Sequence, residues 1–498
     1  MESLQLLAHG FTIAMQPTNL LFAVMGCLLG TLIGVLPGVG PAAGTAILIP
    51  ITFVLDPTPA IIMLSAIFYG AMYGGTITSV LINTPGEAAS AITCLEGYEM
   101  AKRGRAGAAL SIAAIGSFIG GTIATMGLVI LALPLTNLAL KFGPPEFFAL
   151  MVVGLSLVTG LAAKSMTRAL MAAAFGLLIA MVGIDPVMGA PRFTFGITEM
   201  LDGFEFVPVV MGIFGISEIF LNAESEVRGV FDTKMSTLIP TVQDLKDSAG
   251  AILRGTGIGF FLGLIPGVGA VVPTFVSYVA EKKVSKHPEK FGSGVIQGVA
   301  GPETANNAYA NAALIPLFTL GIPGSPTIAI LMGAFMMNGL VPGPFLFKEH
   351  ADFVWAVIAS LYIGNLILVI LNLPLIPLWV AILKVPYSVL FSLILGFCVL
   401  GSYSINSSVF DVAVMVVFGI IGYLFKKLDF PLAPVALTLI LGPLMERGLR
   451  QSLEISRGDF SIFFTRPIAL GLLAIAAIFV LSATFRVVSQ VRGGDTQL

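Results

Sequence analysis

Long apolar runs recur along the chain from Leu20 to Val488, separated by short breaks rich in proline and glycine. A run of about 20 apolar residues can cross the hydrocarbon core of a bilayer as a helix. Charged residues make up 10% of the 498 residues, whereas soluble proteins carry roughly 25%. So few charges cannot form a water-facing surface over a chain of this length. The sequence therefore predicts an all-α polytopic membrane protein.

Charge and motif content exclude several other classes of protein. The 25 basic and 27 acidic residues give a net charge of -2, which provides no basic surface for a nucleic acid. Cys27, Cys94 and Cys398 are far apart, so neither a disulfide framework nor a transition-metal cluster is expected. The chain has no phosphate-binding loop, no H-E-x-x-H and no G-x-S-x-G. ATP hydrolysis and enzymatic catalysis are therefore not expected, and no cofactor is expected other than a coupling ion.

The chain contains an internal duplication. Several motifs recur in the same order, offset by 229 to 240 residues, as expected of a transporter built from two related halves. The matched pairs include GTLIGVLPGVG at 30–40 with GFFLGLIPGVG at 259–269, NTPGEAASAI at 83–92 with GIPGSPTIAI at 321–330, and LALPL at 131–135 with LNLPL at 371–375. The expected domains are an N-terminal segment at 1–19, a first membrane repeat at 20–221, a cytoplasmic linker at 222–249, a second membrane repeat at 250–446, and a loop, final transmembrane helix and tail at 447–498.

Basic residues alternate out of phase between the two halves. The stretch 102–105 carries three basic residues, whereas its counterpart near 338–352 carries one lysine, Lys348. The stretch 281–290 carries four lysines, whereas its first-half counterpart carries only Asp56. Because basic loops stay in the cytoplasm, this pattern predicts two inverted repeats plus one extra C-terminal helix. Parallel repeats with an accidental charge bias are the alternative.

Four Pro-Gly breaks interrupt sequence at membrane depth, at 37–41, 83–87, 266–269 and 321–325. Proline removes a backbone donor and glycine admits positive φ, so discontinuous or re-entrant helices are expected. Lipid offers such a backbone no water, so it persists only beside protein or a water-filled cavity. Kinks or short packing elements without a ligand are the alternative.

The breaks predict a binding site, because free amides and helix N-termini suit a carboxylate and freed carbonyls suit a small cation. Glu303 and Glu87 are ionisable groups at membrane depth, which makes both functional candidates. No Lys or Arg lies within a clearly apolar span, so an anion is expected to be held mainly by amides, hydroxyls and helix ends. The predicted substrate-binding residues are Asn83, Thr84, Pro85, Gly86, Gly321, Pro323, Gly324 and Ser325. The predicted cation-binding residues are Gly38, Gly40, Gly267, Gly269, Asn307, Asn311 and Glu303.

Four long segments resemble a known family. They are GTLIGVLPGVGPAAGTAILIPITF at 30–53, YGGTITSVLINTPGEAASAITCLEGYEMAKRGRAGAAL at 73–110, GFFLGLIPGVGAVVPTF at 259–275 and GPETANNAYANAALIPLFTLGIPGSPTIAILMGAF at 301–335. The chain is similar to the large permease subunit, the TctA family, of tripartite tricarboxylate transporters from about residue 17 to about residue 450.

The resemblance implies a multi-pass permease in the bacterial cytoplasmic membrane. It implies a small four-helix membrane subunit and a periplasmic solute-binding protein as partners, and Na⁺ or H⁺ as the coupling ion. The expected substrate is citrate or a related carboxylate, bound at the four breaks. Two alternatives stay open: an intramembrane enzyme that uses Glu303 and Glu87 as acid and base on a lipid-linked substrate, or a passive channel.

Overall fold

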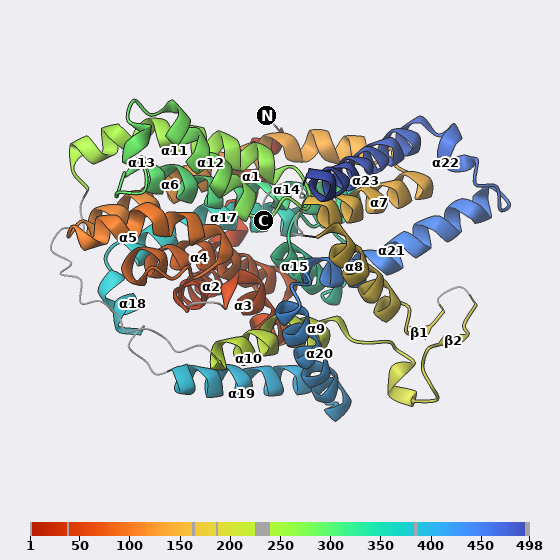
Figure 1. Cartoon of the computed structure of the whole chain (residues 1–498). Coiled ribbons are helices and arrows are strands. Elements are labelled where there is room, and N and C mark those ends of the chain that lie inside the picture. The colour runs from red at the N-terminus through yellow and green to blue at the C-terminus, as the bar shows by residue number, and fades with distance from the viewer. Residues whose placement is uncertain are drawn as a thin grey trace.

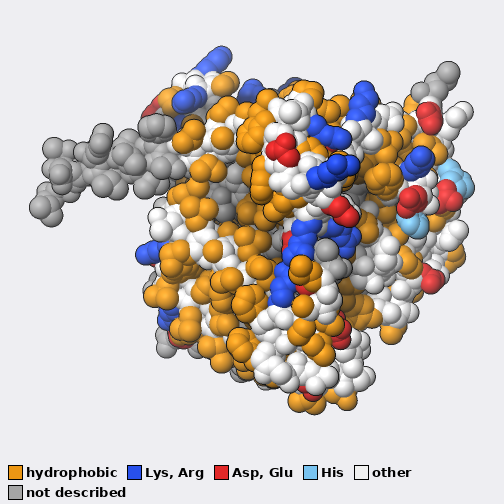
Figure 2. Space-filling view, turned by 90° about the vertical axis from the view of Figure 1, so that its right-hand side faces the viewer, with side chains coloured by type: hydrophobic (Ala, Val, Ile, Leu, Met, Phe, Trp, Pro, Cys, Tyr) orange, Lys and Arg blue, Asp and Glu red, His pale blue; other side chains and the backbone are white. Residues whose placement is uncertain are grey.

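The computed structural model describes residues 2–36, 39–161, 165–185, 188–224, 240–382 and 387–493. These residues form helices almost throughout, and the two strands among them make one short antiparallel hairpin, β1 (Gly183–Ile184) with β2 (Pro191–Arg192). Hydrophobic side chains cover much of the face in Figure 2, with Lys and Arg gathered near its middle. The prediction of an all-α membrane protein is confirmed.

Five helices in the described part of the chain are long and apolar enough to cross a membrane. Several shorter apolar helices accompany them, including the segments 40–54, 144–156 and 326–337. Together they make the chain a multi-pass membrane protein. The five long helices are α2 (Pro17–Val35), α4 (Pro57–Ile82), α6 (Ala106–Ala139), α17 (Ala351–Asn372) and α20 (Val409–Lys427).

A central bundle combines helices from both halves of the sequence. Helix α13 packs against α11, α6 and α4, while α17 packs against α2, α4 and α6. Figure 1 shows green α11, α12 and α13 close to orange α4 and α5. The other elements of this bundle are α1 (Glu2–Ala14), η2 (Ala88–Thr93), α5 (Cys94–Lys102), α11 (Val242–Gly263), α12 (Val271–Val284), η5 (Pro288–Lys290), α13 (Gln297–Ala312) and α14 (Leu314–Leu320).

Two helix pairs in this bundle, α2 with α4 and α11 with α13, pack in the same way. Each contact uses three glycines spaced four residues apart, which bring the two backbones together. A Cβ on Gly30 would lie 2.5 Å from the Ile67 carbonyl oxygen, and a Cβ on Gly259 would lie 2.3 Å from that of Ala305. The glycines differ by 229 in number and their partners by 238, which are the offsets of the sequence motifs. The six glycines are Gly26, Gly30, Gly34, Gly255, Gly259 and Gly263.

Two further groups of helices flank the bundle. One packs α7 against α21 and α23, and the other packs α20 against the π-helical segment η4, which also contacts α3. In Figure 1 the first group lies at the right, and α10, α19 and α20 of the second group lie at the bottom. The first group contains α7 (Pro144–Leu161), α8 (Met166–Ala180), α21 (Ala433–Ile455), α22 (Ile462–Thr465) and α23 (Pro467–Gly493). The second contains α3 (Gly40–Leu48), η1 (Ile49–Val54), α9 (Phe206–Val210), η4 (Met211–Ile216), α10 (Ser217–Ala223), α15 (Pro326–Met337) and α19 (Tyr387–Asn406). The remaining elements are η3 (Thr198–Met200), α16 (Pro344–Glu349) and α18 (Ile376–Ile382).

Two long apolar runs of the sequence are not single helices. In the run 293–320, α13 begins at Gln297 and ends at Ala312, and α14 follows. In the run 169–184, α8 ends at Ala180 and strand β1 follows. Gly183 adopts a φ of 122°, which no helix accommodates.

Candidate functional site

Helices end or begin at each of the four predicted breaks. Asn83 ends α4 with a φ of 54° and Gly321 ends α14 with a φ of 70°, both in the left-handed region. Gly40 begins α3 with a φ of 63°, and Gly269 precedes α12 with a φ of 71°. A Cβ on Gly40 or Gly269 would meet no atom within 4 Å. Both glycines therefore have open space where a side chain would stand.

A cavity of about 470 Å³ lies where the four breaks meet. Each break contributes to its wall, and η4, α10, α13 and α20 complete it. This volume is within the range of pockets that hold small molecules. The residues that line it are Val39, Gly40, Pro41, Ala42, Ala43, Met72, Pro85, Gly86, Glu87, Ala88, Ala89, Phe214, Glu218, Gly269, Ala270, Val271, Tyr309, Ser325, Pro326, Thr327 and Lys426.

The predicted substrate residues fall into two sets. Pro85, Gly86 and Ser325 line the cavity. Ser325 also caps α15, since its hydroxyl accepts a 3.3 Å hydrogen bond from the Ile328 amide. The other predicted substrate residues do not line the cavity: Asn83 and Thr84 are exposed, and Gly321, Pro323 and Gly324 are buried.

Gly86 also has a packing role that the sequence did not reveal. A Cβ on Gly86 would lie 2.0 Å from the Gly34 carbonyl oxygen and 2.6 Å from the Gly75 Cα. A side chain there would force α2 and α4 apart. Its counterpart Gly324 is less confined, since the nearest atom to a Cβ would be the Ala313 Cβ at 3.4 Å.

The predicted cation residues divide between two places. Gly40 and Gly269 line the cavity. The Gly267 amide donates a 3.0 Å hydrogen bond to the Gly324 carbonyl oxygen, which joins the two second-half breaks. Gly38 lies outside the described residues. Glu303, Asn307 and Asn311 are buried in α13, away from the cavity wall.

Glu303 lies in a layer of polar side chains between α4, η2, α6 and α13. It is 1% exposed, and its carboxylate accepts hydrogen bonds from the hydroxyls of Thr76, at 2.5 Å, and Thr93. The Asn307 amide nitrogen donates to the Ser117 hydroxyl at 2.7 Å. The carboxylate forms no ion pair with any described basic residue, so its charge is balanced only by hydroxyl dipoles.

Three residues of the cavity wall were missed in the sequence. Lys426 lies in the last turn of α20 and forms an ion pair with Glu218 of α10. Tyr309 donates a 3.0 Å hydrogen bond from its hydroxyl to the Gly324 carbonyl oxygen. Lys426 therefore adds a basic side chain to the wall of a cavity at which the sequence predicted an anion held by amides, hydroxyls and helix ends. Helical spacing could have placed Tyr309 near the breaks, but no sequence signal pairs Lys426 with Glu218.

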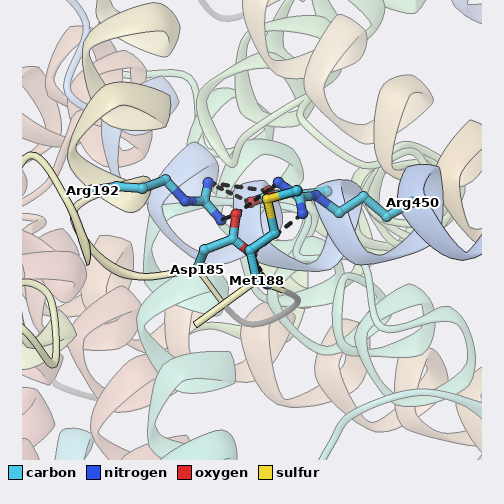
Figure 3. Close-up of polar contacts among 5 residues, drawn as sticks. Asp185, Met188, Arg192 and Arg450 are labelled. Atoms are coloured by element: carbon cyan, nitrogen blue, oxygen red, sulfur yellow. Dashed lines mark hydrogen bonds and ion pairs between the residues drawn. The ribbon is translucent and has the colours of Figure 1, made fainter. Parts of the chain in front are cut away.

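A second ionic cluster lies apart from the cavity, where the β1–β2 hairpin meets α21. Arg192 and Arg450 approach Asp185 from opposite sides, as Figure 3 shows, with N–O distances of 2.8 and 3.0 Å. Glu446 contacts both arginines, at 3.1 and 2.8 Å. This cluster holds the hairpin on α21. Among the described residues no group of three or more His, Cys, Asp or Glu side chains could hold a metal ion.

An all-helical, multi-pass protein with a cavity among interrupted helices has the architecture of a membrane transport protein. A family model for the tripartite tricarboxylate transporter TctA family matches residues 20–437. The chain belongs to the TctA family. It is thus a subunit of a tripartite transporter, whose other components are, in general, a binding protein and a small membrane subunit.

Two curated relatives come from Agrobacterium vitis. An uncharacterized 52.8 kDa protein in the TAR-I ttuC' 3' region is 49% identical over 476 residues, which is 95% of each chain. An uncharacterized protein in the TAR-II ttuC' 3' region is 49% identical over 225 residues, which is 45% of this chain and 93% of that protein. No solved structure matches this chain. Because TctA is a family of transporters, the comparisons favour transport over the enzyme alternative.

Proposed function

We propose that this chain is the permease subunit of a bacterial uptake system for citrate or a related carboxylate. It works in the cytoplasmic membrane as a symporter driven by a Na⁺ or H⁺ gradient. A periplasmic solute-binding protein delivers the substrate, and a small four-helix membrane subunit is the second partner. The observation that carries the proposal is the 470 Å³ cavity on which all four interrupted segments open.

The substrate occupies this cavity. Its carboxylates are held at the second pair of breaks, where the Ser325 hydroxyl is a donor on one side and the Gly86 backbone lies on the other. Pro85 has no N–H and contributes only to the shape of the wall. The other predicted substrate residues set the backbone conformation of the same two breaks and so position the groups that bind the substrate. They are Asn83, Thr84, Gly321, Pro323 and Gly324. Lys426 adds a positive charge at the wall, although Glu218 balances it.

The coupling cation is bound by oxygen atoms. Glu303, Asn307 and Asn311 supply a buried carboxylate and two amides on one face of α13. The carbonyls of the first pair of breaks, near Gly38, Gly40, Gly267 and Gly269, are the second source of ligands. Hard cations such as Na⁺ prefer oxygen donors of this kind.

The two halves move against each other during transport, as inverted repeats do around a fixed midplane site. Support comes from the paired geometry: Gly40 corresponds to Gly269 at an offset of 229, and left-handed Asn83 corresponds to left-handed Gly321 at an offset of 238. The matched glycine contacts of α2–α4 and α11–α13 obey the same offsets.

Leucine substitutions at glycines with open space test the cavity. Gly40→Leu and Gly269→Leu place a side chain in it, whereas Gly104→Leu places one at an equally left-handed glycine, φ 75°, with open space outside it. Backbone strain of about 1–2 kcal/mol is common to all three variants. Uptake of labelled citrate and other carboxylates is measured in proteoliposomes that hold the complete three-component system.

The first two variants are expected to lose at least about tenfold in uptake, while Gly104→Leu stays near the wild-type rate. Normal uptake in both Gly40→Leu and Gly269→Leu would show that the cavity is not the substrate-binding site. An equal loss in Gly104→Leu would trace the effect to strain rather than to the cavity.

A further inference from the structure

Glu87 is a buried carboxylate in the wall of the cavity. Its side chain is 6% exposed, and it directly precedes η2 at the first-half break. The side-chain amide of Asn306 donates a 2.6 Å hydrogen bond to its Oε1. An acidic side chain thus faces the space in which the proposed substrate, itself an anion, is held.

The groups around Glu87 supply no free positive charge. Gly75 of α4 lies against its Cγ, and α13 presents Asn306, Tyr309 and the second buried carboxylate, Glu303. Lys426 of α20 lines the same cavity, but Glu218 of α10 pairs with it. The wall segments 39–43, 269–271 and 325–327 contain no charged residue.

Glu96 is another buried carboxylate nearby in the sequence, and its negative charge is compensated by several hydrogen-bond donors. Its oxygens accept hydrogen bonds from the Tyr278 hydroxyl at 2.8 Å and from three backbone amides of the 292–295 segment at 2.5 to 2.7 Å. A carboxylate with several such donors is stable as an anion. Among the described residues, the Glu87 side chain has the Asn306 amide and, in a capping box, the Ser90 backbone amide as donors, so its charge is less compensated than that of Glu96.

Two carboxylates within one cavity repel each other unless one of them is neutralised. We propose that Glu87 takes up one proton as the substrate anion binds, so that anion and proton cross the membrane together. The proton comes from the water on the side of entry and leaves from Glu87 on the side of release. This inference rests on the proposed function, takes H⁺ as the coupling ion, and assigns it to Glu87 in place of the oxygen atoms of α13.

Asn306 is suited to both states of Glu87. Its amide nitrogen donates to the ionised carboxylate, and its Oδ1 is a buried acceptor with no hydrogen-bond partner among the described residues. After protonation, a half-turn of the amide lets Oδ1 accept a hydrogen bond from the Glu87 hydroxyl. Asn306 is therefore a positioning residue for the proton.

Calorimetric proton counting tests this inference. Binding of citrate to the full chain, purified with its small membrane subunit, is measured near pH 8 in buffers of different ionisation enthalpy, where citrate itself is fully ionised. The wild type is expected to take up about one proton per citrate, and Glu87→Gln none. Glu99→Gln, a carboxylate that pairs with Lys102 outside the cavity, serves as the matched control and is expected to behave as the wild type.

The two proposals fail in different ways. The role of Glu87 is overturned if citrate binds with the same proton uptake in the wild type and in Glu87→Gln. It is also overturned if binding to the wild type depends on Na⁺ and takes up no proton. Either result leaves the cavity assignment standing. No binding of citrate or any other di- or tricarboxylate by the wild type overturns the proposed function and this inference with it. If Glu87→Gln does not fold, Glu87→Asp keeps a titratable group and must retain proton uptake.

Discussion

The Thr76 hydroxyl donates a 2.5 Å hydrogen bond to Oε2 of Glu303 and so joins α4, from the first half of the chain, to α13, from the second. Thr93 donates to the other carboxylate oxygen. Because these hydroxyls are the donors that face the buried charge, each contributes to the stability of the folded chain and to the environment of the carboxylate.

Removal of one donor should destabilise the protein measurably. Thr76→Val keeps the shape of the side chain but leaves one oxygen of a buried carboxylate without a donor, which costs about 1.5–3 kcal/mol. Thermal unfolding in detergent should show a lower midpoint for Thr76→Val, and Thr76→Ser should restore it. An unchanged midpoint in Thr76→Val would mean that the carboxylate is not held as an anion by this hydroxyl.

Because α11 and α13 approach closely, the stability of the protein should depend strongly on the size of the side chain at residue 259. A valine at Gly259 would collide with the Ala305 carbonyl, so the helices must separate, at a cost of about 1–3 kcal/mol or more. Gly257 lies on the same helix with open space around it and provides the control. Gly259→Val should reduce the yield of monodisperse protein in size-exclusion chromatography, whereas Gly257→Val should not.

The ion pair between Lys426 and Glu218 should behave as a coupled unit. Lys426→Met removes the ion pair from Glu218, whose side chain is 16% exposed, and should lower the unfolding midpoint. The double variant Lys426→Met with Glu218→Gln should recover much of this loss. A double-mutant cycle of unfolding midpoints measures the coupling, and additive effects would show that the two groups act independently.

The cluster at the β1–β2 hairpin should contribute to stability and not to transport. Arg192→Ala removes one of the two arginines that contact Asp185 and Glu446, so the hairpin should open and become sensitive to protease. Citrate uptake per folded molecule should stay near the wild-type value, since these residues do not line the cavity. A selective loss of uptake with unchanged protease resistance would assign the cluster a role in transport.

The positions of the breaks could be predicted from the sequence, because Pro and Gly change the backbone locally. Asn83, Gly321, Gly40 and Gly269 are left-handed residues at predicted breaks. Periodicity could not show that Gly86 packs against Gly34, because that contact depends on how two helices cross.

Side-chain partners were harder to predict than breaks. Lys426 and Glu218 are 208 residues apart, and the apolar run before Lys426 indicated a span end followed by a loop. Asn307, a predicted cation-binding residue of α13, donates a hydrogen bond to Ser117 of α6 and does not line the cavity. The helical period gives the face on which a residue lies, and only the packing of neighbouring helices determines what that face meets.

Substrate protection of a single cysteine tests the central claim most directly. Gly269→Cys is introduced into a variant without Cys27, Cys94 and Cys398, and its reaction with a charged thiol reagent is followed in membranes. If the cavity holds the transported carboxylate, the cysteine reacts and citrate, or the carboxylate that the system transports, slows the reaction by about tenfold or more, while Gly104→Cys reacts at a rate independent of substrate. A reaction at residue 269 that no di- or tricarboxylate slows would contradict the account.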